Sequence, residues 1–232
     1  MPLTALLIMA SCATQTPKKP AINTLTETEI SEGWKLLFNG KDLNNWKVYN
    51  GGEVSGWKIE DGVLHNSGVG SDHGGDIITK AQYRNFELYL EWKVSPESNS
   101  GVFFHVVENV APALYQSGPE YQLIDDNGWP GPLNPDQLSG ANYGMHAPKG
   151  AKVNAITDWN VTKLIVNGPH VEHWLNGDKV VEYELWTNEW LELKAGSKWA
   201  EEPYYGAATQ GHIGLQDHGG LTMFRNIKIR EL

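Results

Sequence analysis

The sequence predicts an all-β protein built as a sandwich or a barrel, and three observations support this prediction. Short apolar runs recur from residue 34 to the C-terminus, and Gly, Asn and Asp residues separate them. One run, residues 86–95, alternates strictly between apolar and polar side chains, as a strand with one buried face does. A candidate helix is confined to residues 187–200. Many short strands with regular turns and little helix indicate packed β-sheets.

Turn residues divide the chain into hairpins. Asp61-Gly62 separates two short strand-like runs and is a favoured type I′ pair, which predicts a hairpin. Asn-Gly pairs at 167–168 and 176–177 divide residues 161–185 into a three-stranded meander. Residues 126–158 interrupt this rhythm with a segment rich in Gly, Pro and Asn. A loop of that length inside a compact domain is usually functional or disordered.

Length and composition restrict the ligand class. The chain has 232 residues, which suits a single all-β domain. Its formal net charge of -10 argues against nucleic acid or an anionic membrane surface as the partner. Ten Trp and nine Tyr are many for this length, and such side chains also stack on the apolar faces of sugar rings. The composition is therefore compatible with a carbohydrate ligand.

The N-terminus predicts a lipid anchor. An apolar stretch ends in small residues directly before Cys12, the one cysteine of the chain. This pattern indicates a bacterial lipoprotein signal peptide over residues 1–11, with lipid on Cys12, although a positively charged start is missing. The alternative is a disordered N-terminus with an incidental cysteine. Residues 12–32 are then expected to form a flexible tether and residues 33–232 the folded domain. The expected location is the bacterial cell envelope, with membrane contact through the lipid only.

Six segments of the expected domain together resemble a known family. They are WKLLFNGKDLNNWKV, WKIEDGVL, FELYLEWKVSPESNSGVFF, EYQLIDD, DWNVTKLIVNGPHVEHWLNG and GHIGLQDHGGLTMFRNIKIREL, in that order over nearly all of residues 33–232. On these segments the chain resembles the 3-keto-disaccharide hydrolase domain family. The resemblance implies a concanavalin A-like jelly-roll sandwich of two antiparallel sheets, with a ligand groove on a concave face. Many relatives are bacterial lipoproteins, in agreement with Cys12.

The resemblance also implies a reaction. Its substrate is a glycoside whose sugar carries a ketone at C3, and this ketone acidifies the proton on C2. A base removes that proton, an enolate forms, and the group on C1 departs by β-elimination. Water then adds to the product, which gives net hydrolysis. Such a substrate implies a separate oxidoreductase that makes the ketone.

Strand parity and the resemblance together select the catalytic candidates. A jelly roll brings strands from distant parts of the chain side by side, so polar residues of matching parity are expected to meet on the concave face. Glu120 is the expected base. His105 and His218 are the expected acid, enolate donor or metal ligands, and His105 is expected to share a strand face with Phe103. Relatives often carry an arginine where this chain has His105, which is shorter and titratable.

Other polar and aromatic residues are expected to contact the substrate. They are Gln122, Gln216, Trp129, Tyr143, His146 and Asn99. A divalent cation that chelates the C3 ketone would suit histidine and carboxylate ligands. The sequence contains no compact metal-ligand spacing, so no metal or ligand set is assigned.

Two other functions remain open. The first is a non-catalytic glycan-binding module of an envelope lipoprotein, since a sandwich fold does not decide between binding and catalysis. The second is a retaining glycosidase, which needs two carboxylates about 5–5.5 Å apart. Sandwich glucanases of the laminarinase type carry Glu-x-Asp-x-x-Glu on one strand. This chain has no such run, because Gln122 occupies the position where a carboxylate is wanted.

Overall fold

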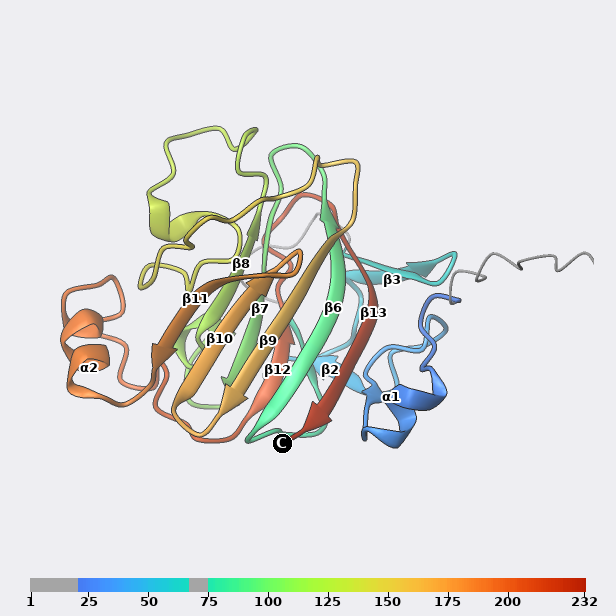
Figure 1. Cartoon of the computed structure of the whole chain (residues 1–232), viewed down its shortest axis with the longest axis horizontal. Helices are drawn as coiled ribbons and strands as arrows, with labels where there is room; N and C mark the ends of the chain where they lie inside the picture. The colour runs from blue at the N-terminus through green and yellow to red at the C-terminus, as the bar shows by residue number, and fades with distance from the viewer. Residues whose placement is uncertain (1–20, 67–74) are drawn as a thin grey trace, which may run out of the picture.

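The computed structural model describes residues 21–66 and 75–232, which form two antiparallel sheets packed against each other (Figure 1). The larger sheet has the strand order β11-β10-β9-β6-β13-β4-β3, with β1 also paired to β13. The smaller sheet has the order β2-β5-β12-β7-β8 and lies behind the larger one. The predicted all-β sandwich of the jelly-roll type is confirmed.

The elements have the following bounds. The larger sheet contains β1 (Lys35–Leu36), β3 (Trp57–Glu60), β4 (Val63–Asn66), β6 (Phe86–Val94), β9 (Asn160–Asn167), β10 (His170–Leu175), β11 (Asp178–Glu184) and β13 (Thr222–Glu231). The smaller sheet contains β2 (Trp46–Val48), β5 (Ile77–Thr79), β7 (Asn99–Val106), β8 (Glu120–Ile124) and β12 (His212–Leu215). The helices are α1 (Glu27–Ser31) and α2 (Asn188–Ala195), with single 3₁₀ turns η1 (Leu114–Gln116) and η2 (Pro135–Gln137).

The predicted local patterns form the expected elements. In β6 every second residue is buried, and these apolar side chains face the smaller sheet across the main core. Asp61 and Gly62 connect β3 to β4 with φ values of 50° and 76°, as a type I′ turn requires. The meander over residues 161–185 forms β9, β10 and β11. The helix expected within residues 187–200 is α2, which Thr187 caps by accepting a hydrogen bond from the Trp190 N–H.

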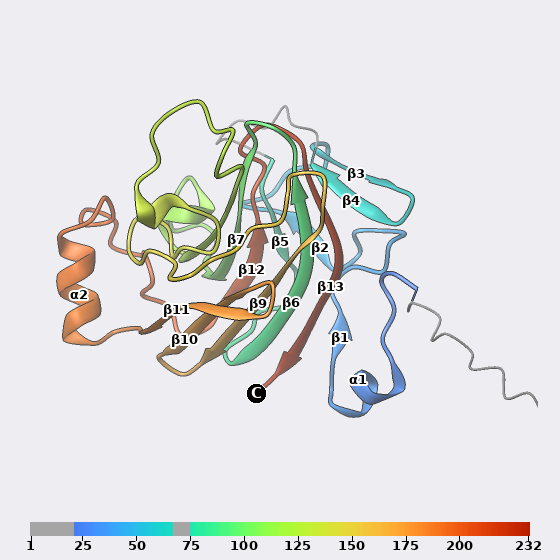
Figure 2. The ribbon, with the colours of Figure 1, turned by 45° about the horizontal axis from the view of Figure 1, so that its top comes forward.

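The folded domain begins earlier than the sequence suggested. Residues 21–32 were expected to belong to a flexible tether, but they pack against the sandwich beside β13 (Figure 2). Asn23 is buried, and its side chain donates to the Gly62 carbonyl over 2.7 Å. Glu29 in α1 forms an ion pair with Lys228 of β13. The tether expectation is therefore wrong for this part. Residues 1–20, including the predicted signal peptide and Cys12, lie outside the described residues.

The described residues give no indication of a membrane-spanning helix. Both α-helices are short, and neither combines the length and the apolar character needed to cross a bilayer.

Strand β7 contains a bulge opposite β12. Val106 pairs with His212, whereas the next pair in the ladder joins Phe103 to Gly214. Two residues of β7 therefore face one residue of β12, and His105 in the bulge has a positive φ of 51°. The expectation that His105 shares the face of Phe103 is wrong, because the bulge interrupts the alternation on which it was based.

The bulge turns the His105 side chain away from the pocket described below. Its ring packs edge-on against the rings of Phe104 and Phe86, with centroid distances of 5.3 Å and 6.2 Å. Its Nε2 lies 2.9 Å from the carbonyl oxygen of Arg84. Burial lowers the pKa of His105, so the ring is held in its neutral form. In this structure His105 is a packed residue at the end of the strand.

The bulge also requires a residue without a side chain at position 211, because Gly211 lies against the backbone of β7. A Cβ at position 211 would lie 2.4 Å from the His105 carbonyl carbon and 2.6 Å from the Val106 carbonyl oxygen. We expect Gly211→Ala to lower the free energy of unfolding by about 3 kcal/mol, because backbone atoms cannot move aside as side chains do. Gly196→Ala is the matched control, since its Cβ would meet nothing closer than 3.7 Å. Urea denaturation of both variants checks this, and equal stability would contradict the bulge geometry.

Candidate active site

A row of polar side chains crosses the outer face of the smaller sheet, the face turned away from the larger sheet. Gln122 of β8 pairs with Gly101 of β7. On the other side, Gln216 donates its backbone N–H to the Gly101 carbonyl over 3.1 Å. Asn99 lies on the same face two residues before Gly101, and Glu120 lies two residues before Gln122. Four polar side chains are therefore gathered around one glycine.

The glycine leaves room for the carboxylate of Glu120. A Cβ at position 101 would lie 2.3 Å from Glu120 Oε1 and 2.8 Å from Phe103 Cε2. The carboxylate thus occupies the space above Gly101 that a side chain would fill. Only glycine, which has no side chain, leaves this space open, and Glu120 can therefore place its carboxylate there.

The long loop over residues 126–158 forms hydrogen bonds with the edge of β8 that does not pair with β7. The Gly140 N–H donates to the Gln122 carbonyl over 2.9 Å, and the Tyr143 N–H donates to the Glu120 carbonyl over 3.1 Å. In return, the Gln122 N–H donates to the Ala141 carbonyl over 3.1 Å. The strand that carries Glu120 is therefore hydrogen-bonded along both edges. This fixes the backbone from which the carboxylate projects.

These elements enclose a pocket of about 300 Å³. The described residues that line it are Asn99, Tyr115, Glu120, Gln122, Tyr143, Lys198, Trp199, Glu202, Gln216 and His218. Six residues predicted as site residues therefore meet in one pocket, from parts of the chain more than a hundred residues apart.

The other three predicted residues lie elsewhere. His105 is packed at the bulge, as described above. Trp129 is next to the pocket, where its ring contacts the exposed His218 edge-on with centroids 6.5 Å apart. His146 lines a neighbouring cavity of about 450 Å³ together with Lys149 and Glu182. Burial lowers the pKa of His146 to about 4, so it is neutral near pH 7.

The sequence reasoning missed four residues of the pocket. Tyr115 belongs to η1, and Lys198, Trp199 and Glu202 belong to the segment after α2. Neither segment is a strand, so alternation within strands could not select them. Trp199, within the stretch 187–200 where a helix was expected, was the one signal available, since a Trp side chain combines a large apolar face with a polar N–H.

A ladder of stacked aromatic rings supports the pocket wall. His146 stacks on Tyr183 (4.6 Å, 8°), and Tyr183 stacks on Trp190 of α2 (5.4 Å, 15°). Trp190 is parallel to Tyr205 (6.1 Å, 1°), which stacks on Trp199 (4.4 Å, 8°). The ladder joins the long loop, β11, α2 and the following segment, and the four rings after the half-buried His146 are buried. The stacking restricts the position of the Trp199 ring at the pocket. The Trp199 Nε1–H also donates to the Tyr143 carbonyl over 2.9 Å.

Lys198 is held beside the same wall. Its Nζ lies 4.4 Å from the ring centroid of Tyr143 and 4.5 Å from that of Trp199, within the range of cation–π attraction. Among the described residues that line the pocket, Lys198 is the one lysine or arginine.

Burial dominates the electrostatics of Glu120. Its residue is 5% exposed, and no hydrogen bond to its carboxylate is formed by the described residues. Desolvation raises the pKa of Glu120 to about 8, the positive charge of Lys198 opposes this shift, and Asp76 adds to it. A carboxylate of this kind is a far stronger base than one in water, once it has lost its proton.

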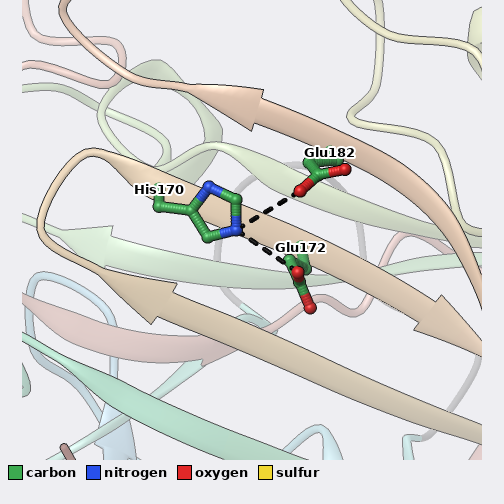
Figure 3. A group of neighbouring side chains, drawn as sticks. All are labelled: His170, Glu172 and Glu182. Atoms are coloured by element: carbon green, nitrogen blue, oxygen red, sulfur yellow. Dashed lines mark hydrogen bonds and ion pairs between the residues drawn. The ribbon is translucent and has the colours of Figure 1, made fainter.

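Among the described residues, one group of side chains has the geometry of a metal site, on β10 and β11 and away from the pocket (Figure 3). His170 Nε2 lies 3.3 Å from Glu172 and 3.6 Å from Glu182. Lys179 is already ion-paired to both carboxylates, at 3.1 Å and 2.8 Å. A hydrogen bond with Glu184 raises the pKa of His170, which favours the imidazolium over a metal ligand. These residues form an ion-pair network, and we assign no metal to them.

Comparison with known proteins decides the family. The model of the 3-keto-alpha-glucoside-1,2-lyase-like domain matches residues 33–230. The chain belongs to this family. A 3-keto-disaccharide hydrolase from Bacteroides thetaiotaomicron is 34% identical over 230 residues, covering 87% of this chain and 79% of the relative. The family resemblance inferred from the sequence is confirmed.

Solved structures agree with this assignment. A candidate glycosyl hydrolase from Parabacteroides distasonis aligns with a TM-score of 0.87 and 40% identity, covering 91% of this chain and all of that chain. A second from the same organism aligns with a TM-score of 0.68 and 31% identity, covering 86% and 99%. The carbohydrate-binding module CBM66 from Bacillus subtilis aligns with a TM-score of 0.52 over 81% and 96% of the two chains. At 11% identity, this last likeness shows the fold alone.

The buried carboxyl group predicts an unusual dependence of stability on pH. The ordinary pKa of 4.5 applies to Glu120 in the unfolded chain, and about 8 applies in the folded chain. Between these values the unfolded chain has lost the proton and the folded chain retains it, so wild-type stability falls as pH rises. The amide of the Glu120→Gln variant does not titrate. We therefore expect the melting temperature of this variant relative to wild type to increase steadily from pH 5 to pH 8.

Thermal unfolding in a pH series measures this difference. A difference that stays constant over the window, or that reverses in favour of the wild type at pH 8, would show that Glu120 is ionised in the folded protein throughout.

Proposed function

We propose that the pocket around Glu120 cleaves 3-keto-glycosides by proton abstraction from C2 and β-elimination of the group on C1, followed by hydration. Family membership and the relative described as a 3-keto-disaccharide hydrolase support a carbohydrate hydrolase. The observation that carries the finer proposal is the position of Glu120, a buried carboxylate without a hydrogen-bond partner among the described residues, on the floor of the pocket.

Glu120 is the base in this proposal. A proton next to a ketone is weakly acidic, and its removal requires a base stronger than an ordinary surface carboxylate. Desolvation supplies that strength by raising the pKa of Glu120 to about 8. The charge of Lys198 opposes the shift, which keeps an appreciable ionised fraction near neutral pH. Glu120 takes the C2 proton, and the C–H electrons form the enolate across C2 and C3.

His218 is the proposed acid for the leaving oxygen. It is exposed beside the pocket, with its ring against Trp129, where the second sugar of a disaccharide would extend toward solvent. As the enolate returns to a ketone, C1–C2 becomes a double bond, the C1–O bond breaks and the departing oxygen takes a proton. Water then adds at C1, and a proton returns to C2. No oxidant or reductant is needed.

The aromatic wall suits a sugar substrate. Tyr115, Tyr143 and Trp199 lie on one side of the pocket, and the apolar face of a pyranose ring stacks on such rings. The same wall would serve a glycan-binding module, which remains the second candidate. Catalysis is distinguished from binding by Glu120, since a binding module needs no base of raised pKa.

The wider setting is part of the same proposal. A ketone at C3 of a sugar has to be made by an oxidoreductase acting on the parent glycoside. The predicted lipid on Cys12 would hold the enzyme at the bacterial cell envelope, close to glycans that enter the cell. A divalent cation that chelates the C3 ketone would add to this chemistry, and no step above depends on one.

Loss of the base is the central test. We expect Glu120→Gln to lower turnover of a 3-keto-disaccharide by roughly 10²–10⁴-fold, because the amide cannot accept the C2 proton. The melting temperature at pH 5 should stay close to that of the wild type. Turnover is measured on a panel of 3-keto-disaccharides, with and without added Mn²⁺, Zn²⁺ or Ca²⁺.

The panel also includes the unoxidised parent disaccharides. Turnover of the parents would favour an ordinary glycosidase, with Glu202 as the second carboxylate of the pocket. Binding without turnover of any member would favour the glycan-binding module.

The pH dependence of the reaction tests the partnership of Glu120 and Lys198. Because the base must be ionised, kcat/KM should rise with pH and level off above about 8, the pKa of Glu120. Removing the neighbouring positive charge raises that pKa, so Lys198→Met should move the rising limb to higher pH. Lys149→Met is the control, since Lys149 lines the neighbouring cavity. A limb that moves equally in both variants, or in neither, contradicts the proposed influence of Lys198.

A further inference from the structure

Three carboxamides surround the Glu120 carboxylate, and each has an oxygen atom without a hydrogen-bond partner in the described structure. The atoms are Asn99 Oδ1, Gln122 Oε1 and Gln216 Oε1. Their residues are 8%, 1% and 5% exposed, so the oxygens are also shielded from bulk water. All three line the pocket. We call this group the amide cradle.

Such an arrangement is unfavourable for stability. A buried amide oxygen that accepts no hydrogen bond has lost its water without replacement, and native proteins contain few such atoms. Three at one place, around one glycine and beside one carboxylate, point to hydrogen-bond donors that arrive with a ligand. The buried Asn142 provides a contrast, since its Oδ1 accepts from the Tyr205 hydroxyl and its Nδ2 lies 3.0 Å from His146 Nδ1.

Building on the proposed function, we propose that the amide cradle is the subsite that recognises the C3 ketone together with its neighbouring hydroxyl groups. Glu120 reacts at C2, and C3 is bonded to C2, so the ketone has to lie over the same glycine. Gln122 of β8 and Gln216, the residue directly after β12, flank that position from two sides, and Asn99 closes it along β7. These are the polar groups that the sheet register places nearest to the base.

The chemistry of a carboxamide matches this part of the sugar. A ketone oxygen only accepts hydrogen bonds, whereas the hydroxyl groups on C2 and C4 also donate them. A carboxamide offers an NH₂ donor and a carbonyl acceptor, and its terminal torsion turns easily to present either one. Amide N–H groups that meet the ketone also stabilise the enolate oxygen as its negative charge develops. Being neutral, the three amides add no charge that would compete with Glu120.

The cradle would therefore distinguish a 3-keto sugar from its 3-hydroxy parent. The amide oxygens without partners accept from the hydroxyl groups on C2 and C4, which leaves the amide N–H groups for the oxygen on C3. The parent places a tetrahedral carbon and a further hydroxyl proton against those N–H donors. A site built around hydrogen bonds rejects an analogue of the wrong donor pattern more strongly than an apolar site rejects a change of size. In this proposal, Asn99, Gln122 and Gln216 are the residues that select the 3-keto sugar over its 3-hydroxy parent.

A probe without a leaving group separates recognition from cleavage. The probe is 1,5-anhydroglucitol oxidised to the ketone at C3, and its reference is unoxidised 1,5-anhydroglucitol. Neither carries an exocyclic group on C1, so no second sugar can be released and the unmutated enzyme can be titrated by calorimetry. We expect wild type to bind the ketone at least tenfold more tightly than the reference. Gln122→Met and Gln216→Met should each reduce this preference to about threefold or less.

Thermal unfolding shows whether the amides serve the ligand or the fold. Removing an amide whose oxygen has no partner should leave the melting temperature unchanged or raise it. Asn99→Leu should therefore be as stable as wild type in the absence of ligand, whereas Asn142→Leu, the same change at a bonded amide, should be destabilised. Cradle variants that melt like Asn142→Leu and keep the full preference for the ketone would overturn the proposal.

Exchange of the C2 proton tests the role of Glu120 as the base separately from ketone recognition by the amide cradle. In D₂O, Glu120 should incorporate deuterium at C2 of the ketone probe, which NMR detects without any cleavage. Preference for the ketone without exchange would support the cradle and contradict Glu120 as the base. Exchange without preference would support the base and contradict the cradle.

Discussion

The carboxylate of Glu120 lies in the space that Gly101 leaves empty, and the rest of the site depends on this contact. A charged group in such a place is poorly solvated, so its proton is held up to a pH of about 8. Once the proton is lost, the same lack of solvation makes the carboxylate reactive. The fold supplies this by pairing β8 on both edges, with β7 on one side and the loop segment 140–143 on the other.

Stability and the proposed function are opposed at this point of the molecule. A buried acid with a raised pKa and amide oxygens without partners both disfavour the folded state. The surrounding structure compensates with an extensive apolar core between the sheets and with the aromatic ladder from His146 to Trp199. The ladder serves both roles, because its last ring is also the wall of the pocket. Local strain at a site and strong packing around it are what a preorganised site requires.

The predictions that were confirmed came from patterns within a few residues of one another. Strict alternation over residues 86–95 predicted β6, and the Asp61-Gly62 pair predicted the hairpin of β3 and β4. The same logic failed at His105, because a bulge breaks parity and leaves no mark in the sequence. It failed again for residues 21–32, whose polar composition resembles a linker. They contact Gly62 and Lys228, which are distant from them in the sequence.

The sequence by itself determined the sheet-forming segments, their buried faces and the family, since these depend on residue type and on spacing within short stretches. It also identified Glu120, Gln122 and Gln216, because parity places them on one face of their strands. Only the tertiary structure decided that they meet over Gly101, and that Tyr115, Lys198 and Trp199 close the pocket from loops. Those neighbours are set by strand order and loop packing, and such contacts between distant segments follow no local period.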